Sequence, residues 1–208
     1  MRANLAALAL GVALGVALAA HAAGPQLDSN APIHLDARSS DVDYKNGVGA
    51  FHAVKISQGA FSIEADEGNA VGLDFVKSDW TFHGNVKIAM PDGSIASDAA
   101  RISFANNQIV SAQITGAPAV FEQRRDKHVA RGRAAQIDYD VPAQTVKLSN
   151  GATLSVDDHD ISARTLIYDM GEQKLRANPE EQEGTAVSLT FDPKKPAIKL
   201  TTDPKPKP

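Results

Sequence analysis

The residues that could perform chemistry are few and poorly arranged for catalysis. His52 and His83 each follow a phenylalanine, but neither has a second ligand at a tight His or carboxylate spacing. Glu64 and Asp66 fall on one face of a predicted strand, as a glycosidase pair would, although contact with solvent explains that face better. The run 157–160 (Asp-Asp-His-Asp) lacks the glycine and the spacing of a calcium loop. We therefore expect no catalytic residue, no metal site, no cofactor and no enzymatic activity.

A basic cluster could bind an anion. It runs from Arg124 to Arg133 and includes Arg125, Lys127 and His128. Arginine pairs well with phosphate because its planar fork of donors matches the phosphate oxygens. Arg124, Arg125 and Lys127 are therefore candidate phosphate contacts. The alternative is a solvated hairpin that only aids solubility.

Composition restricts the class of protein. The chain has 208 residues, a formal net charge of -4 and no cysteine. A general nucleic-acid-binding domain would be strongly basic, so that function is disfavoured. Without cysteine there is no thiol catalysis and no disulfide, and stability must come from hydrogen-bonded ladders and apolar burial.

The N-terminal segment is typical of an exported protein. Arg2 precedes an uncharged run from Leu5 to Ala20, and Ala20-His21-Ala22 has the small-x-small pattern of a cleavage site. We predict a signal peptide over 1–22 and a polar linker over 23–31. The alternative is an uncleaved anchor, although the apolar run is shorter than the roughly 20 residues that a membrane-spanning helix needs.

The elements that would position these residues are short strands. Apolar and polar residues alternate over 33–38, 61–65, 71–75 and 137–141, which places one apolar row on one face of each strand. Asn-Gly and Asp-Gly pairs at 46–47, 92–93 and 150–151 separate the strands as turns. The sequence predicts an all-β, antiparallel body over 32–191 and a flexible Pro- and Lys-rich tail over 192–208.

An internal repeat organises the strands. The segment from Phe51 to Ile56 resembles the segment from Phe82 to Ile88. Ile56, Ile88 and Leu154 are followed at one common spacing by Ile63, Ile95 and Ile161. Each unit is thus a predicted hairpin, and because one hairpin cannot bury its own apolar face, the units must stack.

Several motifs follow one another along the chain. They are Pro32-Ile33-His34-Leu35-Asp36, Val54-Lys55-Ile56-Ser57-Gln58-Gly59, Ile63-Glu64-Ala65-Asp66, Gly116 to Gln123, Gly132 to Tyr139, Leu148 to Ala152, and Ile167 to Ala177. In this order they resemble the LptA/OstA family, the periplasmic component of lipopolysaccharide transport. The resemblance covers roughly Pro32 to Asn178. The stretch 82–108 departs from the resemblance as an extra hairpin unit. It would either lengthen the apolar groove that the family fold implies or mark a paralogue with a different partner.

The resemblance implies a fold, a cargo and partners. It implies a twisted, open antiparallel β-jelly roll of stacked hairpins in the periplasm, which joins end to end. Such a bridge carries lipopolysaccharide from an inner-membrane partner to an outer-membrane partner, with the acyl chains inside an apolar groove. It also implies lipid contact at Ile33, Leu35, Phe121, Tyr139 and Val141.

Alternation alone adds Ile56, Ile63 and Ile88 to the groove, although residues in such a pattern are usually core. The open edges would be Ile33–Ala37 and Thr165–Lys174, where unpaired backbone groups recruit further strands. The alternative is that the Lys-rich tail covers the second edge.

Two further functions remain open on the residues alone. A membrane-anchored relative could hand lipid to a soluble carrier, which requires Met1 to Ala20 to stay attached. A polysaccharide-binding β-protein would need a platform of aromatics, but aromatic residues make up only 5% of the chain and Trp80 is the one tryptophan.

Overall fold

The computed structural model describes residues 31–91, 93–125, 128–140, 142–157, 159–169, 172, 174–179 and 186–190. Twelve strands lie in this part of the chain. They are β1 (Ile33–Asp36), β2 (Ser39–Asp43), β3 (Val48–Gln58), β4 (Phe61–Val71), β5 (Lys77–Met90), β6 (Gly93–Ala105), β7 (Gln108–Arg125), β8 (His128–Asp140), β9 (Thr145–Val156), β10 (His159–Asp169), β11 (Lys174–Ala177) and β12 (Ser188–Thr190). The predicted signal peptide and C-terminal tail lie outside the described residues.

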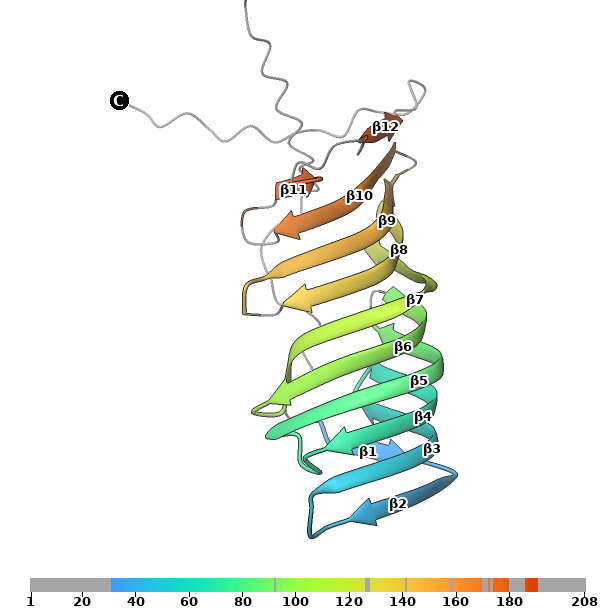
Figure 1. The fold of residues 1–208 in the computed structure, drawn as a ribbon, viewed down its shortest axis with the longest axis vertical. Helices are drawn as coiled ribbons and strands as arrows, with labels where there is room; N and C mark the ends of the chain where they lie inside the picture. The colour runs from blue at the N-terminus through green and yellow to red at the C-terminus, as the bar shows by residue number, and fades with distance from the viewer. Residues whose placement is uncertain are drawn as a thin grey trace, which may run out of the picture.

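The strands form one antiparallel sheet that rises as a stack of hairpins (Figure 1). From β3 to β10 each strand pairs with the next along the chain. At one end of the stack β1 and β2 both pair with β3, and at the other end β11 and β12 both pair with β10. Each edge is therefore one interrupted strand made of two short pieces.

The long strands bend at their middles. The register shifts between Glu64 and Glu67, and again at corresponding places up to the shift between Ala163 and Thr165. Such bulges increase the local twist and bend a strand. In β5 the bend uses Gly84 and Asn85, whose φ values of 75° and 48° lie in the left-handed region that these residue types tolerate.

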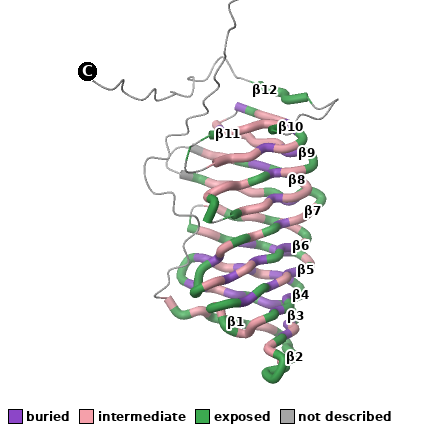
Figure 2. The backbone as a smooth tube through the Cα atoms, turned by 60° about the vertical axis from the view of Figure 1, so that its left-hand side comes forward, coloured by how far each residue is buried: buried purple, intermediate pink, exposed green. Residues whose placement is uncertain are grey.

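The bends divide the sheet into two walls, which we call wall A and wall B. Wall A contains β2, 48–52, 67–71, 77–83, 99–105, 108–115, 136–140, 145–149, 165–169 and β11. Wall B contains β1, 54–58, 61–65, 86–90, 93–97, 119–125, 128–134, 152–156, 159–163 and β12. Residues of both walls belong to one apolar core, so the walls enclose it between them (Figure 2).

Side chains inside the walls form continuous rows, because the residues of a row pair directly from strand to strand. The wall B row is Leu35, Ile56, Ile63, Ile88, Ile95, Phe121, Gly132, Leu154, Ile161 and Leu189. The wall A row is Val42, Gly49, Ala70, Trp80, Ile102, Ala112, Tyr139, Val146, Tyr168 and Leu175. Both rows run from one edge of the sheet to the other.

The predicted fold class is confirmed, and the repeat has a structural meaning. Ile56, Ile88 and Leu154, with the residues that follow each at the common spacing, all lie in the wall B row. The stretch 82–108, predicted to be an extra hairpin unit, forms part of β5, β6 and the turn after them, inside the stack. Its strands belong to the same rows.

Two local predictions were wrong. The alternation of Val71, Leu73 and Phe75 predicted a strand, but β4 ends at Val71 and the next five residues form a connecting loop before β5. Gly72 has a φ of 81°, which breaks the extended conformation there. The second edge is also not Thr165–Lys174, because Thr165–Asp169 belongs to β10 and is covered by β11 and the Asn178 region.

Candidate functional site

The candidate groove is the space between the two walls. Among the residues expected to line it, Ile56, Ile63 and Ile88 are buried, with at most 4% of each residue exposed. Leu35 lies at the open end of the same row and is 39% exposed, while Phe121 is half-buried further along it. Ile33 is half-buried beside Gln58, Tyr139 lies in the wall A row, and Val141 lies outside the described residues. Seven of the eight predicted residues thus face one interior.

An aromatic stack fills the interior between β3 and β6. The ring of Trp80 lies 5.5 Å from that of Phe51 and 6.0 Å from that of Phe82, at interplanar angles of 23° and 13°. Trp80 is 1% exposed, and its indole N–H donates a hydrogen bond of 3.2 Å to Ser78 Oγ. These rings each bury large apolar areas, so this section is packed core in the present structure.

The loop 72–76 closes the mouth of this section. Phe75 stacks on Trp80 at 5.5 Å and meets the edge of Phe104 at 5.0 Å. The backbone ties the loop to both neighbouring turns, since Gly72 N donates to Gly47 O at 2.8 Å and Asn107 N donates to Phe75 O at 2.9 Å. Sequence reasoning missed this closure because the loop has the alternation of a strand.

The wall A row is more exposed between β7 and β11 than between β4 and β6, although Ile137, Leu148 and Leu166 next to it are buried. Ala112, Tyr139, Val146, Tyr168 and Leu175 are all partly exposed, whereas Ala70, Trp80 and Ile102, earlier in the same row, are at most 2% exposed. Burial raises the pKa of the Tyr139 phenol, and burial together with the negative charge of Asp169 raises the pKa of Tyr168. Both phenols are therefore neutral at physiological pH.

A comparison with known protein families identifies the family of this chain. Residues 67–174, just over half of the chain, match the family described as LptA/(LptD N-terminal domain) LPS transport protein. The chain belongs to this family.

Two proteins with which the chain shares similarity are a transport protein and a solved structure. The chain is 28% identical over 138 residues to the lipopolysaccharide export system protein LptA of Haemophilus influenzae, which covers 60% of this chain and 79% of that protein. Its fold is similar to the crystal structure of LptH of Pseudomonas aeruginosa, with a TM-score of 0.51 and 18% identity. That match covers 80% of this chain and 99% of LptH, so the stacked-hairpin architecture is shared along nearly all of that chain.

In this family member the described side chains of the basic cluster that bond to Glu122 lie outside the groove. The strand alternation puts Arg124 and Arg131 on the outer face of wall B, opposite to Phe121 and Gln123. Both arginines bond to Glu122, with Arg124 Nε at 2.6 Å from Oε1 and Arg131 Nε at 2.8 Å from Oε2. Hydrogen bonds from Arg131 and Arg124 lower the pKa of Glu122. Lys127 and the side chain of Arg125 lie outside the described residues.

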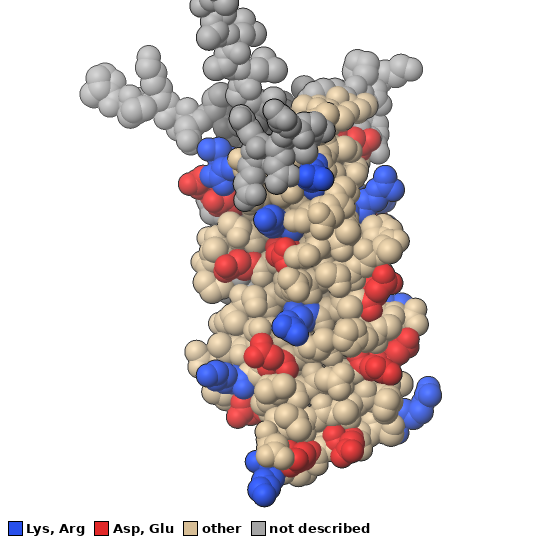
Figure 3. Space-filling view, in the orientation of Figure 1, with Lys and Arg blue, Asp and Glu red and all other residues tan. Residues whose placement is uncertain are grey.

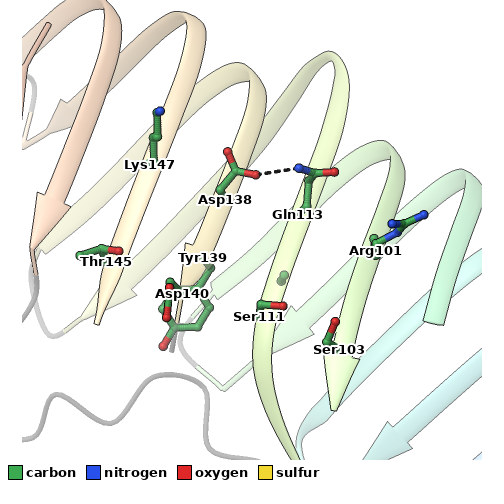
Figure 4. A pocket seen from close by; sticks show the side chains of 10 residues that line it. Arg101, Ser103, Ser111, Gln113, Asp138, Tyr139, Asp140, Thr145 and Lys147 are labelled. Carbon is green, nitrogen blue, oxygen red and sulfur yellow. Dashed lines mark hydrogen bonds between the residues drawn. The ribbon is translucent and has the colours of Figure 1, made fainter. Parts of the chain in front are cut away.

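The outer face of wall A carries a shallow polar depression of about 470 Å³ (Figure 4). Arg101, Gln113, Asp138 and Lys147 stand side by side on neighbouring strands there, and Gln113 Nε2 donates to Asp138 Oδ1 at 3.1 Å. Positive and negative side chains are interspersed over the visible face of the molecule (Figure 3). This outer surface has the character of a solvated face.

The described residues contain neither a candidate metal site nor a candidate membrane-spanning helix. His52, Glu67 and His83 are cross-strand neighbours on the outer face, but no group of three His, Cys, Asp or Glu side chains among the described residues is arranged to hold a metal. Over the same residues, no helix is long and apolar enough to cross a membrane. What the fold offers is an apolar interior with charged groups kept outside.

Proposed function

We propose that this chain is a periplasmic carrier that shelters the acyl chains of lipopolysaccharide between walls A and B on the way from the inner to the outer membrane. The observation that supports it best is the wall B row, which is apolar from edge to edge and ends in exposed leucines, Leu35 at 39% and Leu189 at 44%. Each buried CH₂ contributes about 0.8 kcal/mol. An apolar interior therefore offsets the large cost of exposing several acyl chains to water.

The geometry of the basic cluster suits a lipid with an anionic head. An acyl chain inside the walls would leave its phosphates outside the apolar interior, where charged side chains such as Arg124 and Arg131 lie. Arg124, Arg125 and Lys127 remain proposed phosphate contacts. Their use would require Glu122 to share its arginines, and the ion pairs are exposed enough for such an exchange to cost little.

The partners would meet the chain at its two edges. β1 and β2 run antiparallel to β3, and β11 and β12 run antiparallel to β10, so the two ends of the ladder point in opposite strand directions. A second copy added end to end would therefore form an antiparallel junction. The membrane-bound transport components would dock at the same edges.

One register continues both interior rows across such a junction. It sets Leu189 against Leu35 in wall B and Leu175 against Val42 in wall A, and it brings Arg176 opposite Asp41 and Lys174 opposite Asp43. The first edge is thus acidic where the second edge is basic. Complementary charge favours this head-to-tail contact over contact between two like ends.

In-cell photocrosslinking tests the carrier function. A photoreactive residue at Ile33, Phe121 or Tyr139 should give lipopolysaccharide adducts. The matched positions Asp138 and Glu64, which lie on the outer faces of the same walls, should give none. Adducts of equal yield at inner and outer positions would contradict transport between the walls.

The domain limits form part of the proposal. We propose a signal peptide over 1–22, a linker over 23–31, the β-jelly roll over 32–191 and a tail over 192–208. A membrane-anchored family member is the alternative, and N-terminal sequencing of protein recovered from the periplasm distinguishes them. A start near Ala23 supports the soluble carrier, whereas a retained Met1 supports the anchor.

A further inference from the structure

The hydroxyl group of Tyr139 is an unusual feature of the partly exposed section of the wall A row. Its oxygen is buried from solvent and has no hydrogen-bond partner among the described residues. Its neighbours along the row are Ala112 and Val146, whose side chains offer neither donor nor acceptor. A buried tyrosine hydroxyl normally finds a partner, because leaving it unpaired forfeits the hydrogen bond that it made to water.

The place of Tyr139 in the row indicates where such a partner would come from. The aromatic stack occupies the interior on one side, at Trp80 and Phe82. On the other side, from Ala112 to Leu175, the residues of the row are partly exposed to solvent. Tyr139 therefore lies in the partly exposed section of the row, and its hydroxyl is the donor that a guest entering there would meet.

The apolar walls around Tyr139 limit which chemical group of a bound molecule could accept its hydrogen bond. Burial raises the pKa of the Tyr139 phenol, so the hydroxyl is a neutral donor that needs an acceptor oxygen. A charged phosphate or carboxylate would lose its hydration between apolar walls, which is costly without a countercharge. A neutral oxygen attached to a hydrocarbon chain avoids that cost, because the chain itself favours burial.

We propose that the Tyr139 hydroxyl donates a hydrogen bond to a neutral oxygen at the head of an acyl chain, either an ester or amide carbonyl or a β-hydroxyl group. This inference rests on the proposed function, and it makes Tyr139 a specificity-determining residue. It places the acyl heads between β7 and β10, and it lets the groove prefer acyl chains over plain alkyl chains of the same length.

The test compares three sugar amphiphiles with chains of equal length. They are an alkyl maltoside, a sucrose monoester of the saturated acid, and a sucrose monoester of the β-hydroxy acid. Each displaces a dansyl-labelled fatty acid from the purified full-length chain. The variants are Tyr139→Phe, which removes only the hydroxyl, and Tyr44→Phe, which makes the same change at a residue that is 85% exposed.

The wild-type chain and Tyr44→Phe should bind at least one of the two esters about tenfold more tightly than the alkyl maltoside. Tyr139→Phe should bind all three ligands alike, at the affinity that the wild type shows for the maltoside. A gain with both esters identifies the carbonyl, and a gain with the β-hydroxy ester alone identifies the β-hydroxyl.

Two results would overturn the inference while leaving the carrier function intact. One is equal binding of all three ligands by the wild type, and the other is an ester preference that survives in Tyr139→Phe. Failure of the wild type to bind the labelled fatty acid or any amphiphile would count against the proposed function itself, and the inference would fall with it.

Discussion

The ring of Phe121 occupies the space that a side chain at position 132 would need. The two residues are direct cross-strand partners in the wall B row, and a Cβ placed on Gly132 would overlap three carbons of the ring. The φ of Gly132 does not lie in the left-handed region, so the glycine is required by packing and not by backbone conformation. The Phe121 side chain therefore fills the interior space of both positions.

We predict that Gly132→Ala destabilises the fold by about 1–3 kcal/mol, because the ring of Phe121 must leave its place to admit a methyl group. Urea unfolding measures the loss. The control is a double-mutant cycle with Phe121→Leu, in which the smaller side chain should recover much of the stability lost at position 132. Additive losses in the double variant would contradict the shared site.

Phe75→Ala should open the closed section of the interior. The variant loses two ring contacts, to Trp80 and Phe104, and should cost about 2 kcal/mol, less than for a fully buried phenylalanine. Because Trp80 is the single tryptophan, its fluorescence reports the change directly. We expect a red shift and faster acrylamide quenching, whereas Val76→Ala, at a residue 53% exposed, should leave both unchanged. An unshifted spectrum in Phe75→Ala would show that the loop does not close the mouth.

The Glu122 ion pairs should make stability depend on pH in the acidic range. Hydrogen bonds from Arg131 and Arg124 lower the pKa of Glu122 from its ordinary 4.5. A lowered folded-state pKa contributes stability above the unfolded value, and that contribution disappears as the pH falls through the lowered value. Glu122→Gln should therefore have a lower urea midpoint than the wild type at pH 7 and the same midpoint well below pH 4.5.

Salt provides the control for Glu122, since these pairs are exposed and screening weakens exposed pairs. High salt should reduce the difference between the two proteins at pH 7. A difference that persists at low pH would mean that Glu122→Gln acts through something other than its charge.

The proposed junction register predicts a charge-swap result. Asp41→Arg should weaken end-to-end association because it sets two positive charges opposite each other, and Arg176→Asp should weaken it in the same way with two negative charges. The double variant should associate again. Sedimentation velocity over a range of protein concentrations measures the assembly state.

Arg176 also bonds within the chain, to Glu172 at 3.0 Å, so unfolding curves must show that each variant is folded. Association that is insensitive to both single changes, or a double variant as weak as either single one, would rule out this register. A different register would then have to join the ends.

The sequence predicts those features of the fold that depend on neighbouring residues along the chain. The alternation around Ile56 and Ile63 marks strand faces correctly because a side chain's face depends only on its parity along the strand. The same rule failed at Leu73 and Phe75. Gly72 ends the strand there. The loop residue Phe75 is apolar because it packs against Trp80, so the loop has the same apolar pattern as a strand.

The site was harder to predict than the fold. Repeat spacing and resemblance brought seven of the eight expected residues to one interior, but they did not show that the wall A row is buried over β4–β6 and partly exposed over β7–β11. That difference depends on which residues oppose each other, such as Trp80 beside Ala70 and Phe121 over Gly132. Opposition across strands is set by register, which turn chemistry fixes but single-strand patterns do not reveal.

The ladder's interior order, from β1 through β10 to β11, has ten rungs, and their parity has a consequence for how such a protein can grow. Inserting a whole hairpin would add two rungs and leave the terminal strands running in opposite directions. A single inserted strand would turn one end around, and copies stacked in series would then face each other with parallel edges. Length in this architecture should therefore change in pairs of strands.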